Sequence, residues 1–143
     1  MRRRGFEHER DLVRRLWSEG FAVMRAPASG SKVKRTMYPD IVAIMNGRVF
    51  VFEVKTSYRE KTIYIPRNQV EKIVEFARRA NGKAFIAVKI IGSGTWRCIP
   101  IGELEETRGG NYRWRSELVR KGLKIRDLVE MVKSCKKIDE YLD

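Results

Sequence analysis

The sequence of 143 residues has few of the side chains that form disulfide bridges or bind zinc. It contains two cysteines, Cys98 and Cys135, which are far apart, and a single histidine, His8. A disulfide framework or a zinc site needs several such residues at close spacing. The composition therefore indicates neither of these two ways of holding a fold together.

Long apolar runs are absent as well. No segment reaches the roughly 18 consecutive apolar residues that a membrane-spanning helix needs. The first residues, MRRRGFEHERD, are basic but lack the apolar core of a secretion signal. We therefore expect a cytoplasmic protein with no membrane partner.

Acidic residues are scarce relative to basic ones. The chain has 31 Lys and Arg against 18 Asp and Glu, which gives a formal net charge of +13. This excess favours a polyanionic partner, with nucleic acid ahead of an anionic membrane surface, and no small-molecule substrate is expected. Because no linker, repeat or low-complexity segment interrupts the chain, residues 1–143 are expected to form a single domain.

The apolar pattern predicts helices and strands in an α/β order. Segment 6–19 is expected to be a helix, with one apolar face and Gly20 at its end: Phe6, Leu12, Val13, Leu16 and Trp17. Two more helices are expected at 67–80, after Pro66, and at 127–141. Strands are expected at 21–25, 40–45, 48–55, 62–65, 84–91 and 95–99. This order predicts a central mixed β-sheet flanked by helices.

The pair Asn46-Gly47 between two apolar segments predicts a β-hairpin with a two-residue turn. In such a hairpin Met45 faces Arg48, and the same register places Asp40 opposite Glu53. Facing side chains lie on one side of the sheet, and Lys55, two residues after Glu53, points to the same side. Three charges are therefore expected at one place in an apolar hairpin.

Two facing carboxylates repel each other unless a cation lies between them. Asp40 and Glu53 supply oxygen ligands at a spacing that suits a hard divalent cation such as Mg²⁺ or Mn²⁺. Glu9 falls on the apolar face of the first helix and is a candidate further ligand. The alternatives are a strand-capping role for Asp40, a surface pair of Glu53 with Lys55 on an edge strand, and a boundary glutamate that reaches solvent.

Pro39-Asp40 followed by Glu53-Val54-Lys55 resembles the PD…ExK motif of the restriction-endonuclease-like nuclease superfamily. The surrounding segments GFEHERDLV, GFAVMRAPASGSKVKRTMYPDIVA and QVEKIVEFARRANG are similar to those of archaeal Holliday-junction resolvases. The resemblance runs from about Gly5 to Val88, and more loosely through TRGGNY to the C-terminus. It implies a restriction-endonuclease-like α/β fold in a single nuclease domain. It also implies an endonuclease that resolves four-way DNA junctions by paired nicks during homologous recombination and repair.

The resemblance also implies site residues by motif position. Three acidic residues would hold the metal ion, Mg²⁺ with Mn²⁺ as a substitute, and the motif lysine would act in catalysis: Glu9, Asp40, Glu53 and Lys55. Ser29, in the loop ASGS, corresponds to a serine implicated in the active site of these enzymes. Gln69, at the start of the second helix, is a further candidate near the motif.

Basic residues near these segments are candidate phosphate contacts, although a single Lys or Arg is more often a solvated surface residue. They are Arg2, Arg3, Arg4, Arg10, Arg14, Arg25, Lys32, Lys34 and Arg35. The loop 29–39 is the strongest candidate, because it joins Ser29 to Asp40. Trp114 lies in a basic segment and has two interpretations, stacking on a base or packing at an exposed position.

The two-fold symmetry of a four-way junction favours a C2 homodimer, because resolution needs nicks in two opposed strands. The resolvases that the sequence resembles are homodimers. On the helix 67–80, Phe76 flanks the apolar face made by Val70, Ile73, Val74 and Ala77. We expect Phe76 at or near the dimer interface, and the alternative is partial burial in its own chain.

Two other functions stay open at this point. A different nuclease of the same superfamily, of the DNA-repair or restriction type, would cut nicked, flapped or mismatched duplexes. A non-enzymatic architectural protein that binds or bends DNA accounts for the net charge but not for the acids expected in the interior, and it would show no metal-dependent nicking.

Overall fold

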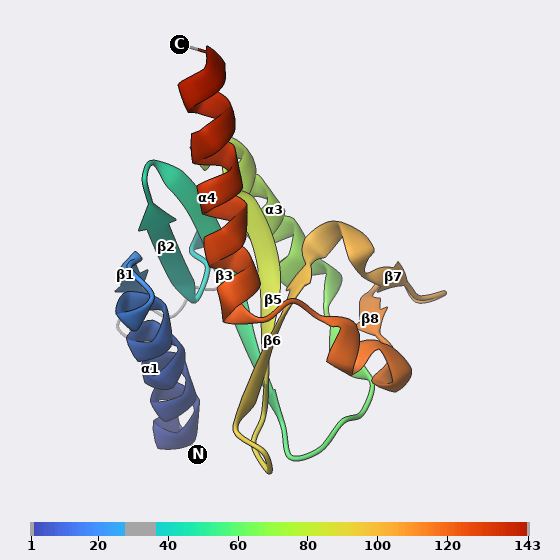
Figure 1. Cartoon of the computed structure of the whole chain (residues 1–143). Helices are drawn as coiled ribbons and strands as arrows, with labels where there is room; N and C mark the ends of the chain where they lie inside the picture. Colours follow the sequence, from blue (N-terminus) through green and yellow to red (C-terminus); the bar gives the residue numbers. More distant parts are fainter. Residues whose placement is uncertain (1, 28–36, 143) are drawn as a thin grey trace.

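The computed structural model describes the backbone of residues 2–27 and 37–142 and the side chains of residues 6–27 and 37–134. Its centre is a five-stranded sheet of order β1-β2-β3-β5-β6 (Figure 1). The strands are β1 Ala22–Arg25, β2 Ile41–Met45, β3 Arg48–Ser57, β5 Lys83–Ile90 and β6 Thr95–Pro100. Strands β3 and β5 are parallel and the other neighbours are antiparallel. The mixed sheet predicted from the element order is confirmed.

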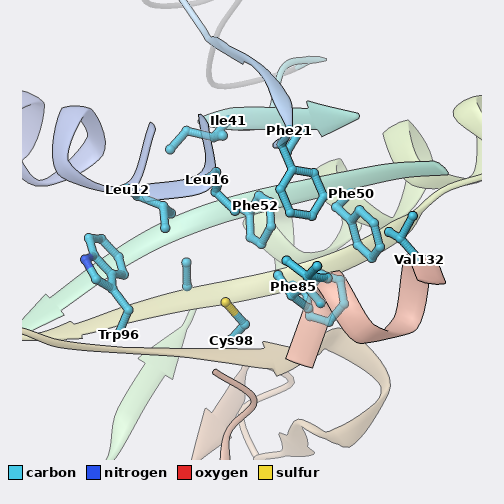
Figure 2. Packing of buried hydrophobic residues seen from close by; sticks show 14 residues of the cluster. Leu12, Leu16, Phe21, Ile41, Phe50, Phe52, Phe85, Trp96, Cys98 and Val132 are labelled. Atoms are coloured by element: carbon cyan, nitrogen blue, oxygen red, sulfur yellow. The ribbon is translucent and has the colours of Figure 1, made fainter. Parts of the chain in front are cut away.

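Helices cover both faces of this sheet. Helix α1 (Arg2–Ser18) and helix α4 (Ile125–Leu142) pack on one face, and helix α3 (Arg67–Ala80) packs on the other (Figure 1). Successive residues of β3 alternate between the two faces. Phe50 and Phe52 join the first core, where Phe85, Leu12 and Leu16 also lie (Figure 2). Val51 joins the second core, beneath α3.

The hairpin of β2 and β3 has the predicted register. Met45 faces Arg48, and the ladder continues to Ile41 opposite Phe52. Asn46 and Gly47 have φ values of 51° and 77°, as a two-residue turn matching the twist of the strands requires. Counted from the turn, the regular pairing ends at Ile41, so Asp40 lies one residue beyond the ladder.

A small second sheet of order β4-β8-β7 adjoins the start of α3 (Figure 1). Its strands are β4 Ile63–Ile65, β7 Glu105–Glu106 and β8 Tyr112–Trp114, with short 3₁₀ helices at Ile101–Glu103 and Ser116–Lys121. Trp114 is only 6% exposed and belongs to the core beneath α3. Neither of the two interpretations from the sequence is therefore correct, because Trp114 is a core residue rather than an exposed one that packs on the surface or stacks on a base.

Two apolar residues predicted to face inward are exposed. Trp17 on α1 is 64% exposed and Val74 on α3 is 41% exposed. Each follows the fully buried residue of its helix, Leu16 or Ile73, by one position, which is a rotation of about 100° about the axis. The core-facing stripe of each helix is narrower than the apolar stripe in the sequence.

Candidate active site

Asp40, Glu53 and Lys55 meet at the end of the hairpin remote from its turn. Asp40 immediately precedes β2, while Glu53 and Lys55 lie in the second half of β3. Oδ2 of Asp40 accepts a hydrogen bond of 2.8 Å from the backbone N–H of Val54. This bond fixes the carboxylate beside the strand that carries the other two charges.

Both carboxylates of the hairpin are buried. Asp40 is 8% exposed and Glu53 is 5% exposed, and β3 is the middle strand of the five-stranded sheet. The alternative of a surface pair on an edge strand is therefore wrong. Burial of two like charges side by side is unfavourable unless cations compensate them.

The charges of this site perturb one another. Burial raises the pKa of Glu53, the charge of Asp40 raises it further, and the ammonium groups of Lys72 and Lys55 oppose that rise. Burial lowers the pKa of Lys55, although the two carboxylates partly compensate. Lys55 Nζ also donates a hydrogen bond of 2.6 Å to Oε1 of Gln69, so the structure brings this further candidate into the site.

Lys72 of α3 is the residue that the sequence reasoning missed. Its Nζ lies 3.1 Å from Oε1 of Glu53, and the two side chains are 6% and 7% exposed. Gln69 and Lys72 are three residues apart and therefore share one face of α3. That spacing is the local signal in the sequence that relates Lys72 to Gln69, but it does not show which face of α3 meets the sheet.

Glu9 forms an ion pair with Arg25 rather than with the charges of the hairpin. It is 9% exposed on α1, so the alternative of a glutamate reaching solvent is wrong. Its Oε1 lies 3.6 Å from Nη1 of Arg25, whose guanidinium stacks 4.9 Å from the ring centre of Phe6. In the sheet, Arg25 of β1 lies opposite Ile41 of β2, and the next residue, Ala26, donates a backbone hydrogen bond to the carbonyl of Asp40.

The three predicted acidic ligands do not form one group. Among the side chains of residues 6–27 and 37–134, no three from Asp, Glu, His or Cys lie close enough together to hold a metal ion. Asp40 and Glu53 are the acidic pair of the site, and Arg25 engages Glu9.

The other predicted site residues are distributed as follows. Arg10 and Arg14 are exposed on α1, and Arg14 lies 3.9 Å from Asp11. Phe76 is half-buried against the core beneath α3. Arg2, Arg3 and Arg4 lie in α1, but their side chains are outside the described set, and Ser29, Lys32, Lys34 and Arg35 lie outside the described residues altogether.

A mixed sheet that carries a buried Asp before one strand and Glu-x-Lys on the next defines a nuclease of the restriction-endonuclease-like class. The model of the archaeal Holliday junction resolvase family matches residues 1–137, and the chain belongs to this family. It is therefore an endodeoxyribonuclease that resolves Holliday junctions. The fold class and the activity predicted from the sequence are confirmed.

Individual relatives agree with this assignment. The chain is 44% identical to the crossover junction endodeoxyribonuclease Hjc of Sulfurisphaera tokodaii, over 98% of this chain and 94% of the relative. It is 36% identical to the Hjc enzyme of Archaeoglobus fulgidus over 90% of each chain. The solved structure of that Hjc, a Holliday junction resolvase, superimposes with a TM-score of 0.76 at 32% identity and covers 87% of this chain and 94% of its own.

None of the helices in the described part of the chain is both long enough and apolar enough to cross a membrane. The cytoplasmic location expected from the sequence stays a prediction.

Proposed function

We propose that Asp40 and Glu53 hold a divalent cation, Mg²⁺ or Mn²⁺, at which this enzyme hydrolyses the DNA backbone of a four-way junction. The observation that carries the proposal is a pair of adjacent carboxylates that are only 8% and 5% exposed. Oε1 of Glu53 is buried without a hydrogen bond of normal geometry, as expected of an oxygen suited to a metal ion. When bound, the cation supplies neutralisation of phosphate charge and a lower pKa of an attacking water.

Lys55 stabilises the negative charge that develops on the scissile phosphate. Its ammonium is partly desolvated, which strengthens its interaction with an anion. The hydrogen bond to Gln69 orients it, and a group that is already oriented needs no rearrangement when the substrate reacts.

Glu9 and Arg25 support the same site from its other side. Arg25 lies beside Asp40 through the pairing of β1 with β2, and its ion pair with Glu9 holds it there. We assign to Arg25 a phosphate contact next to the metal. Glu9 completes the acidic surroundings, either as a ligand through a water or by holding Arg25. Ser29 and the basic residues of the loop, Lys32, Lys34 and Arg35, keep their proposed roles from the family resemblance alone.

A homodimer with two such sites fits the two opposed nicks that resolution needs. Met24 and Ile44 are 74% and 41% exposed, and strand register places them on the same face of the sheet as Val42. That face also carries α3, with exposed Val74 and half-buried Phe76. We call the surface of Met24 and Ile44, which are diagonal neighbours across β1 and β2, the apolar patch; Val74 and Phe76 lie on the two flanks of α3, on the same side of the sheet. Its exposed side chains support a self-complementary interface there.

The proposed metal role is tested with Glu53→Gln on a synthetic immobile four-way junction. Because the amide keeps the size of the side chain but is a poor ligand for a hard cation, junction binding is retained and cleavage falls by at least about 100-fold. Cleavage of nicked, flapped and mismatched duplexes by the wild type, measured in parallel, tests the selectivity for junctions. A variant that cuts at the wild-type rate in saturating Mg²⁺ would show that the metal assignment is wrong.

A further inference from the structure

We propose that Lys72 is the internal cation of the metal-free site: its ammonium neutralises Glu53 until a divalent cation takes its place. The inference rests on the proposed binding of a metal by Asp40 and Glu53. Lys72 acts through Glu53 and is therefore a positioning residue. The motif that identifies the nuclease class includes Lys55 but not this second lysine.

The burial of Lys72 requires a partner. Its side chain is 6% exposed, although it lies on a helix, where a lysine usually extends into solvent. A buried ammonium without an opposite charge strongly destabilises a fold. The carboxylate of Glu53, 3.1 Å away and 7% exposed, supplies that charge. The pair therefore stabilises the fold when no metal is present.

The charges of the metal-free site add to zero. When all four groups are ionised, Asp40 and Glu53 contribute two negative charges and Lys55 and Lys72 contribute two positive charges, and Glu53 and Lys55 each interact with the other three. A divalent cation added to this set leaves an excess of two positive charges in a poorly hydrated place. That arrangement is unfavourable unless one of the lysines moves away.

The contacts of the two lysines indicate which one is displaced. Lys55 keeps a partner of its own, because it donates a hydrogen bond to Gln69. The pair with Glu53 is the single ion pair of Lys72 in the part of the chain that the structure describes. A metal ion that binds Glu53 removes that partner, so Lys72 and the metal compete for one carboxylate. The competition weakens metal binding but protects the empty site.

The test is calorimetric titration of MnCl₂ into the full chain without DNA, for the wild type and Lys72→Met. Competition predicts that the variant binds Mn²⁺ about tenfold more tightly, because one positive charge near the ion is gone. It also predicts a lower melting temperature without metal, and a larger rise on adding metal. An affinity equal to or weaker than that of the wild type overturns the proposal, because it means that Lys72 only orients Glu53.

Two further variants separate charge from packing. Lys72→Arg keeps the positive charge and restores an affinity close to the wild-type value. Lys89→Met is the matched control, because Lys89 is 14% exposed and its Nζ lies 3.0 Å from Asp11, away from the site. It loses stability with no change in Mn²⁺ affinity. An equal tightening in Lys89→Met overturns the proposal.

The remaining outcomes are also decisive. If Lys72→Met shows no cooperative unfolding transition, Lys72→Gln takes its place, since an amide is neutral but has N–H groups that can donate a hydrogen bond to Glu53. The same tightening is expected for it, and its absence overturns the proposal. A wild type that binds no Mn²⁺ refutes the metal role of Asp40 and Glu53 itself, which distinguishes failure of the proposed function from failure of this inference.

Discussion

The ionisation state of Glu53 depends on opposing interactions with its surroundings. Its burial and the nearby charge of Asp40 favour the protonated form, and the two lysines favour the ionised form. In the role that we propose for Glu53, the carboxylate must be deprotonated to bind a metal ion, so protons and the metal would compete for it. The same environment would then determine the pH range in which the proposed site binds metal.

We predict that the affinity for Mn²⁺ decreases as the pH falls below 7. Burial, with the charge of Asp40, raises the pKa of Glu53 from 4.5 to about 7. One pH unit below that value, at pH 6, the affinity is about tenfold weaker than its limit at high pH. Titrations at pH 6, 7 and 8 measure this decrease. A flat affinity down to pH 6 would mean that Glu53 has the pKa of an ordinary glutamate, or that it is not a ligand.

The sequence predicts the members of the site that lie on one hairpin, but not those that depend on packing between elements. A two-residue turn determines the register, so the meeting of Asp40, Glu53 and Lys55 follows from their spacing. The approach of Lys72 depends on how α3 sits on the sheet, which local spacing does not specify. For the same reason, the pair of Glu9 with Arg25 was not foreseen.

Among the elements, α1 is joined to the sheet by a polar contact at Asp11. Oδ2 of Asp11 accepts a hydrogen bond of 2.8 Å from Nε1 of Trp96, on β6, and lies 3.0 Å from Nζ of Lys89, on β5. Arg15 of α1 adds a hydrogen bond of 3.1 Å to the same oxygen. This contact therefore fixes α1 against strands β5 and β6 of the sheet.

We predict that Asp11→Asn destabilises the protein in a pH-dependent way. Burial alone would raise the pKa of Asp11, but hydrogen bonds from Trp96 and Lys89 and the charges of Lys89 and Arg15 outweigh it and lower the pKa to about 2. A lowered pKa stabilises the fold above the ordinary value of 3.8, and this contribution is lost as the pH falls towards 2. The expected loss at pH 7 is on the order of 1–2 kcal/mol.

Denaturant unfolding at pH 7 and at pH 2 measures this difference between wild type and variant. Glu130→Gln is a suitable control, because Glu130 is 63% exposed and its pair with Lys133 is 3.9 Å long. That change has little effect at either pH. A loss in Asp11→Asn that is the same at both pH values contradicts the assigned role of the charge.

The elements that were predicted are those with a long periodic pattern or a distinctive turn. Helix α3 begins after Pro66 and ends at Asn81, which has a left-handed conformation with φ 52°, as its flanking residues indicated. The second sheet was not predicted, because β7 and β8 are two and three residues long. They are held by pairing across the chain and by ion pairs of Glu105 with Arg113 and Arg115, which leave no local signal.

For the molecule as a whole, net charge and symmetry both bear on how it binds and cuts a four-way junction. The net charge of +13 provides attraction to a junction with four negatively charged arms. It does not by itself coordinate two nicks, for which two sites must be held at a defined separation. In the homodimer that we propose, the apolar patch holds the two sites at that separation.

We predict that Ile44→Glu, a charge placed in the apolar patch, converts a dimer into monomers. Ile44 is 41% exposed on β2 and Asp40 lies at the other end of that strand, so the substitution leaves the carboxylate pair intact. Sedimentation at micromolar concentration measures the change, with Trp17→Glu as the control, since Trp17 is 64% exposed on a helix of the other face.

On a supercoiled plasmid with an extruded cruciform, the dimer cuts both strands in one binding event and yields linear DNA. The monomer makes one nick, which relaxes the plasmid and removes the cruciform before a second cut. A wild type that sediments as a monomer and still yields linear DNA would contradict this account.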